Sequence, residues 1–161
     1  MGNVRDPLRA QLVRLLDWEE AHVGFDMAVG DIPADKRGAR AQGFEHSSWQ
    51  LLEHMRIAQK DILDFSVSRA YVHELTWPDD YWRKNPMPPD AAAWDVSVAD
   101  FKSDREKLKQ LARNEAIDLL TQVPTGTAHQ TVLRGILLAA DHTAYHLGQL
   151  VAVRRALGIW K

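Results

Sequence analysis

The stretch LRGILLAADHTAYHLGQLV, residues 133–151, decides the fold and holds the first candidate site residues. A helix written through it is apolar almost all round, which is typical of a helix at the centre of a helical protein. We expect this helix to run from about residue 128 to residue 157 and to end at Gly158. His142 and His146 lie four positions apart, about 40° around the helix, so their side chains can reach one point.

This histidine pair requires partners, because a buried imidazole without a hydrogen bond or a metal destabilises the fold. Histidines at positions i and i+4 of a helix are a common metal-binding arrangement. Zincin proteases have a glutamate directly after the first histidine, where this chain has Thr143, so the sequence argues against a zincin. A polar network without metal stays open as an alternative.

Three more helices are predicted from apolar residues at steps of three and four. Their expected bounds are 6–30, with Asp6 as the N-cap, 47–71 and 95–122. Ser47 and Gln50 match the Ser-x-x-Gln capping box. No alternating strand pattern competes with them. The sequence therefore predicts an all-α four-helix bundle in a single domain of residues 1–161.

The second predicted helix adds a third histidine to the candidate site. His54 shares its helical face with Leu51, Ala58 and Ile62, so we expect it to point into the core. Facing helices of a bundle are where metal sites form, and three imidazoles with open positions are typical of a catalytic metal site. Imidazoles suit several divalent metals; zinc or nickel is our first expectation, with iron or manganese as further options.

The composition excludes several kinds of site and argues against some classes of partner. The chain has no cysteine, which excludes disulfides, thiolate-bound zinc and a cysteine nucleophile, so any thiol must come from a small molecule. A formal net charge of -2 without a long basic block argues against a nucleic-acid partner. The sequence shows no signal peptide and no run of about 18 apolar residues, so we expect a cytoplasmic protein without a membrane partner.

Residues 76–94, TWPDDYWRKNPMPPDAAAW, form the longest irregular stretch. Its prolines forbid a regular helix, but its aromatic residues do not suit a disordered linker. We expect this segment to pack on the helices or to cover an opening.

Residues 47–63, SSWQLLEHMRIAQKDIL, and 137–160, LLAADHTAYHLGQLVAVRRALGIW, resemble the DinB-like superfamily. The most specific part is the His-x-x-x-His pattern followed by Gly148, Gln149 and the Arg-Arg-x-Leu-Gly tail. The resemblance implies a four-helix bundle with an up-down-down-up arrangement. It also implies a divalent metal held at the positions of His54, His142 and His146, and it implies homodimers. Characterised members include transferases and isomerases that depend on a low-molecular-weight thiol.

These observations favour a metal-dependent enzyme, a thiol-dependent transferase or a hydrolase, acting on a small molecule. Residues expected to orient the imidazoles or to line the cavity are His22, Asp26, Asp61, Asp141, Tyr145 and Gln149. Glu19 and His22 resemble half of a di-iron site, but the chain has no second Glu-x-x-His pair. The alternative is a non-catalytic dimeric stress-related or ligand-binding protein with a structural or vestigial metal site, which gains if His22 is a fourth ligand.

Overall fold

The computed structural model describes residues 7–17 and 19–160, and the regular elements in these ranges are helical. The α-helices are α1 (Pro7–Leu15), α2 (Phe25–Val29), α3 (Ser48–Val67), α4 (Ala93–Arg113) and α5 (Val132–Ala156). Two 3-10 turns, η1 (Ala34–Lys36) and η2 (Asp79–Tyr81), lie in the connections. The described residues form no strand, only one isolated bridge between Gln122 and Thr131. The all-α prediction is confirmed for these ranges.

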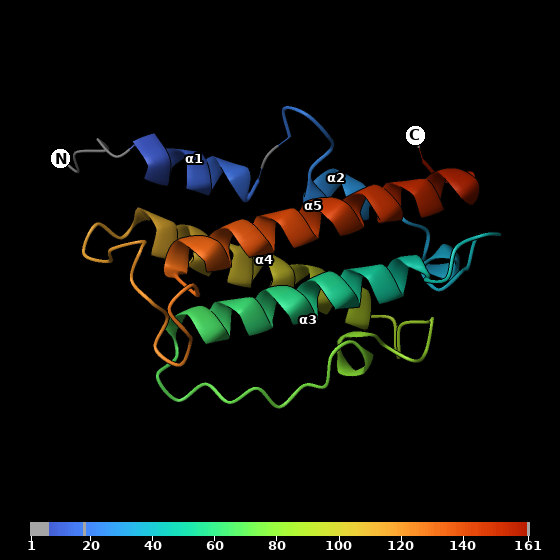
Figure 1. The fold of residues 1–161 in the computed structure, drawn as a ribbon. Helices are drawn as coiled ribbons and strands as arrows, with labels where there is room; N and C mark the ends of the chain where they lie inside the picture. The colour runs from blue at the N-terminus through green and yellow to red at the C-terminus, as the bar shows by residue number, and fades with distance from the viewer. Residues whose placement is uncertain (1–6, 18, 161) are drawn as a thin grey trace.

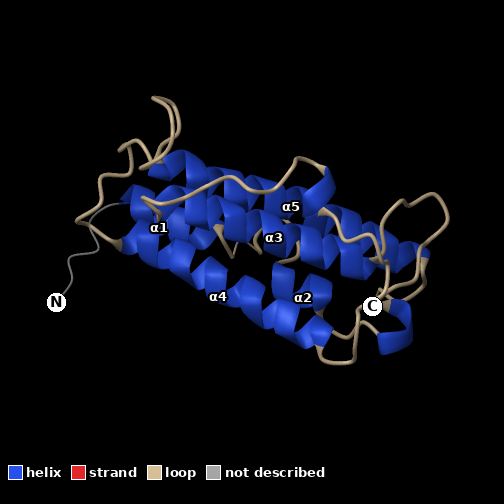
Figure 2. Cartoon of the chain, turned by 90° about the horizontal axis from the view of Figure 1, so that it is seen from below, coloured by secondary structure: helices blue, strands red, loops and turns tan. Residues whose placement is uncertain are grey.

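Of the three long helices, α4 and α5 both pack against α3 (Figure 1). In this view α3 and α4 run in the same direction and α5 runs in the opposite one. The connection between α3 and α4 must therefore return along the length of the helices, and residues 68–92 do so beneath α3. Figure 2 shows the other long loops at the two ends of the helices. The returning segment brings Tyr81 and Trp82 close to the first half of α3.

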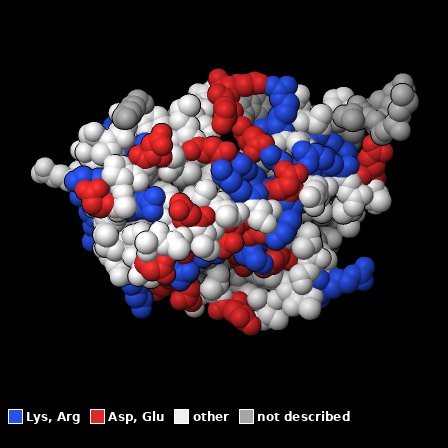
Figure 3. All heavy atoms as spheres, turned by 180° about the vertical axis from the view of Figure 1, so that it is seen from behind, with Lys and Arg blue, Asp and Glu red and all other residues white. Residues whose placement is uncertain are grey.

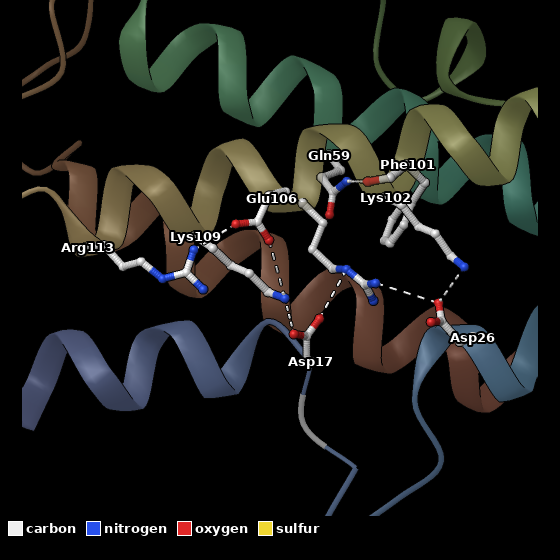
Figure 4. A network of polar contacts seen from close by, with 9 residues as sticks. Asp17, Asp26, Gln59, Phe101, Lys102, Glu106, Lys109 and Arg113 are labelled. Atoms are coloured by element: carbon white, nitrogen blue, oxygen red, sulfur yellow. Dashed lines mark hydrogen bonds and ion pairs between the residues drawn. The ribbon is translucent and has the colours of Figure 1, made fainter.

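The first predicted helix is wrong in its extent, because the chain forms α1 and α2 with an irregular connection between them. Asp17 lies in this connection and pairs with Arg105 and Lys109 of α4. Figure 4 shows Asp17 and Asp26 both directed at α4. These ion pairs, together with the stacking of Phe25 on Phe101, hold the connection against α4 where a continuous helix would have run straight. Asp6, the expected N-cap, lies outside the described residues.

The start of α3 is as predicted. The Ser47 hydroxyl accepts a hydrogen bond from the Gln50 backbone N–H at 3.2 Å, and the Gln50 amide oxygen accepts one from the Ser47 N–H at 3.1 Å. This capping box satisfies two N–H groups that a helix start leaves without partners. It fixes the start of the helix that carries His54.

The end of α5 at Ala156, shortly before Gly158, agrees with the prediction, whereas three other helix ends differ from it. The helix α3 ends at Val67 and α4 at Arg113, both earlier than expected, and α5 begins at Val132, after its N-cap Thr131. Between α4 and α5, the side chains of Asn114 and Asp118 accept hydrogen bonds from backbone N–H groups two residues later. Such local bonds stabilise turns in competition with helix. The apolar periodicity gave no sign of them.

Close packing of α3 against α5 depends on a glycine. A Cβ atom added to Gly135 would lie 2.3 Å from the Ser66 hydroxyl oxygen, so no larger residue fits without movement.

No described helix is both long and apolar enough to cross a lipid bilayer. On the face drawn in Figure 3, acidic and basic side chains are intermixed, without a large area of one sign.

Candidate metal centre

Three histidines from two helices meet between α3 and α5. The Nε2 atom of His54 lies 3.0 Å from Nε2 of His146 and 3.0 Å from Nε2 of His142. One ring nitrogen from each histidine falls within 4.8 Å of the other two. In the described part of the chain this is the one cluster of three or more histidine or carboxylate side chains with such spacing. The structure thus brings together the three residues that the sequence singled out.

The outer nitrogens of two of these rings have fixed partners. His54 Nδ1 lies 3.0 Å from the carbonyl oxygen of Tyr81, and His146 Nδ1 lies 2.7 Å from the amide oxygen of Gln149. Each oxygen can only accept, so each Nδ1 carries the proton. In the neutral rings the Nε2 atoms of His54 and His146 therefore present lone pairs, the form in which imidazole binds a metal.

The surroundings keep these rings neutral. His54 is 1 % exposed, His146 is also buried, and His142 is partly exposed. Burial, with a smaller effect of the neighbouring His146, lowers the pKa of His54 to about 4. Burial and the other two histidines lower the pKa of His142 to about 3, and burial also lowers the pKa of His146. At neutral pH all three are uncharged and available as ligands.

The donor set fits a divalent cation. Two ligands bound to one zinc ion at about 2.0–2.1 Å in a tetrahedron lie about 3.3 Å apart, close to the 3.0 Å between the Nε2 atoms. The lone pairs of His54 and His146 face each other without a donor between them, which is unfavourable unless a cation occupies that position. Because the pKa of His54 is about 4, a proton does not supply that charge at neutral pH.

Residues 17–150 match the DinB superfamily, a range that contains all three histidines. The chain belongs to the DinB superfamily. Comparison with curated proteins and with solved structures gives no match. The matched range includes the parts of α3 and α5 that carry the three histidines. The distances between these histidines are those of this chain.

Trp82 and His46 complete the centre of this DinB superfamily chain, and neither was predicted to do so. The indole of Trp82 stacks on His54 with ring centroids 3.7 Å apart and planes 3° apart. His46 stacks on the same indole at 3.7 Å and 13°. The aromatic residues of segment 76–94 are one signal of such packing, but no pattern in the sequence indicates which of them reaches His54.

Glu53 is a further residue beside the site that the sequence did not indicate. It is 2 % exposed and accepts hydrogen bonds from Arg56, Arg83 and Ser97. Burial alone would raise its pKa, but the bonds from Arg56, Ser97 and Arg83 outweigh burial and lower the pKa to about 2. Glu53 is therefore ionised at neutral pH, one residue from His54 in sequence but directed at α4 and the returning segment.

Of the residues expected to orient the imidazoles, two contact His146. Gln149 accepts its Nδ1–H, and the Tyr145 ring packs edge-on against it with centroids 4.9 Å apart. Tyr145 is 65 % exposed, so its phenol also faces solvent. Asp61 reaches His54 only indirectly, because it accepts a hydrogen bond from the Tyr81 hydroxyl at 2.6 Å while the Tyr81 carbonyl holds His54.

The remaining three expected residues lie elsewhere. His22 is exposed, and its Nδ1 contacts the carbonyl oxygen of Val23, so it is not a fourth member of the cluster. Asp26 pairs with Lys102 at 3.2 Å and with Arg105 at 3.6 Å, as Figure 4 shows for Lys102. Asp141 is exposed at the surface of α5. The expectation that these three residues orient the imidazoles or line the cavity at the centre is therefore wrong.

Proposed function

We propose that this DinB superfamily protein binds one divalent metal ion through the Nε2 atoms of His54, His142 and His146. The observation that carries the proposal is the meeting of these nitrogens at 3.0 Å, with the opposite nitrogens of His54 and His146 held by a carbonyl and an amide oxygen. That outer arrangement fixes the rings and raises their strength as ligands.

The reaction that we propose is thiol-dependent group transfer or hydrolysis of a small molecule. Three protein ligands leave coordination positions open, and a divalent ion there lowers the pKa of a water or thiol bound beside the imidazoles. The absence of cysteine means that a thiol would be a separate small molecule. Tyr145, exposed beside His146, is placed to contact a substrate at this position.

The proposal also includes the identity of the metal, the arrangement of the helices and the oligomeric state. We take zinc or nickel as the first candidates for the metal, with iron or manganese as further options. We also propose the DinB-like up-down-down-up arrangement, with α1 and α2 together in the place of the first helix, and a cytoplasmic homodimer as the working form.

A second candidate function has one specific observation in its favour. Trp82 covers a face of His54, and two of the three histidines are buried, which would limit access to a bound ion. A non-catalytic ligand-binding or stress-related protein with a structural or vestigial site would have this character. Its metal would not exchange ligands with small thiols.

The test is the metal content of untagged protein, measured by inductively coupled plasma mass spectrometry. We expect about one metal ion per chain in the parent and in His22→Ala, and none in His54→Ala or His142→Ala. His22→Ala is the matched control, because it removes an exposed histidine outside the cluster. A parent that cannot be loaded with zinc, nickel, iron or manganese would contradict the proposal.

A cobalt-loaded sample separates the two candidate functions. Addition of a small thiol should change its visible spectrum if the ion has an open position. An unchanged spectrum at saturating thiol, in a protein that retains its cobalt, would favour the structural site.

A further inference from the structure

Three consecutive residues of the returning segment, Tyr81, Trp82 and Arg83, are each fixed to α3 beside the metal centre. We call them the strap. The Tyr81 carbonyl accepts the His54 Nδ1–H at 3.0 Å, and the Trp82 indole stacks on the His54 ring. Arg83 donates to Glu53 at 2.7 Å. Tyr81 and Trp82 therefore both contact His54. Arg83 contacts Glu53, the residue that precedes His54 in the sequence.

Trp82 is held on both faces. His46 and His54 each lie 3.7 Å from the indole and nearly parallel to it, so two rings at this distance must occupy opposite faces. The indole of Trp82 is thereby fixed between a residue that precedes α3 and a residue within α3. His54, in turn, has one ring face covered by Trp82 and its Nδ1 edge bonded to the preceding residue, Tyr81.

Arg83 anchors the strap through two bonds. Its guanidinium Nε donates to the buried Glu53 carboxylate, and its own carbonyl accepts from the Gln50 side-chain amide at 2.7 Å. Glu53 already receives two bonds from Arg56 and one from Ser97, so Arg83 is not needed to neutralise or satisfy it. The Arg83 side chain is 50 % exposed, so its ion pair with Glu53 contributes little net stability. Such a pair can still fix one geometry among several. Here the geometry it fixes is that of Trp82.

We propose that Arg83 is a positioning residue of the metal centre, acting through Trp82 to hold the His54 ring in the plane in which Nε2 faces His142 and His146. This inference rests on the proposed metal function. It assigns to the Glu53–Arg83 pair, which touches no histidine of the cluster, a role in metal affinity.

The experiment compares zinc affinities, measured by competition with a chelating dye, in four variants. Arg83→Met removes the side-chain bond to Glu53 and keeps the backbone bond from Gln50. Lys84→Met is the matched control, because it removes the same charge from the next residue, whose side chain makes none of the strap contacts. Trp82→Leu removes the stacked ring, and the fourth variant combines Arg83→Met with Trp82→Leu. Thermal unfolding of each variant shows that it is folded.

We expect Arg83→Met to weaken zinc binding by about tenfold, as loss of an outer partner of a metal ligand does, and Lys84→Met to leave it within about twofold of the parent. In the Trp82→Leu background, Arg83→Met should add little further loss, because its effect passes through the indole. Equal affinities of Arg83→Met and Lys84→Met would overturn the inference. An undiminished effect of Arg83→Met without the indole would also overturn it.

A readout without metal separates this inference from the proposed function. In the metal-free protein, the exchange rate of the His54 Nδ1 proton, followed by nuclear magnetic resonance, reports how firmly the ring is held against the Tyr81 carbonyl. Faster exchange in Arg83→Met than in Lys84→Met supports the strap, even if the parent binds no zinc and the metal function fails. Equal rates overturn the strap, even if the parent binds zinc normally.

Discussion

His54 and His146 present their Nε2 atoms to each other across 3.0 Å, although the Nδ1 atom of each ring holds the proton that its outer partner requires. Two lone pairs are thus held together from helices whose histidines are 92 positions apart in sequence. The fold maintains this contact through buried packing and the outer hydrogen bonds. A bound cation would turn the contact from unfavourable to favourable.

The first prediction concerns pH. The pKa values of His54 and His142, about 4 and about 3 in the folded protein, lie below the value of about 6.5 expected in the unfolded chain. Below pH 6.5 the unfolded chain therefore takes up protons that the folded chain does not, and stability is lost as the pH falls. We expect the thermal midpoint of metal-free protein to be level above pH 7 and to decline from about pH 6.5 downwards.

The control for this decline is His142→Asn, which removes one of the depressed groups and should flatten the curve between pH 6.5 and 5. Carboxylates titrate mainly below this window, so they affect both proteins little within it. Equal slopes in the parent and in His142→Asn would show that these histidines do not govern the acid sensitivity.

The second prediction concerns metal removal. A ligand that binds only the folded state stabilises it by about 2.7 kcal/mol at a free concentration of one hundred times Kd. Zinc at that concentration should raise the thermal midpoint of the parent and of His22→Ala, and a chelator should reverse the rise. His142→Ala should show no zinc-dependent rise. A similar rise in His142→Ala would place the stabilising site elsewhere in the chain.

The third prediction concerns Gln149, whose amide oxygen accepts the His146 Nδ1–H at 2.7 Å. Replacement of such an outer partner typically costs about 10–100-fold in metal affinity. We expect this loss in Gln149→Ala, whereas Gln149→Glu should bind as tightly as the parent because a carboxylate is also an acceptor. Asp141→Asn, an exposed change on the same helix, should leave the dissociation constant unaltered. Dye competition measures all three.

The fourth prediction concerns the close approach of α3 and α5. Gly135→Ala gains up to about 1 kcal/mol of helix propensity but forces a Cβ against the Ser66 hydroxyl, and such overpacking costs about 1–3 kcal/mol. We expect a net loss in the free energy of unfolding, measured in urea. Ser66→Ala removes the clashing oxygen and leaves its Cβ 3.5 Å from the new methyl group. Gly135→Ala should therefore stabilise the Ser66→Ala protein; a loss of equal size in both backgrounds would contradict the steric explanation.

The sequence predicted the three central histidines because helical periodicity is strong in α3 and α5. His142 and His146 are four residues apart in a helix that is apolar on most sides, and His54 shares a face with core residues. The capping box at Ser47 is also a local pattern, and it is present as predicted. Such features depend on neighbours within one or two turns.

The missed features depend on distant neighbours. The apolar residues at helical spacing in 6–30 are compatible with one helix. The break accompanies ion pairs of Asp17 with α4 residues more than 80 positions away. Trp82 reaches His54 because segment 68–92 crosses back along α3, a path that no local pattern indicates. His22 and Asp26 were placed near the centre on the assumption of that single helix, which explains why their positions could not be predicted.

The separation of 92 residues between His54 and His146 also sets when the centre can exist in a cell. A ribosome adds roughly 5–20 residues per second, so α5 follows α3 out of the ribosome by roughly 5–18 seconds. During that interval the nascent chain can contain α3 and Trp82 but only one of the three imidazoles. Metal capture by the full triad therefore follows the synthesis of α5, after the residues that stack on and hold His54 have been made.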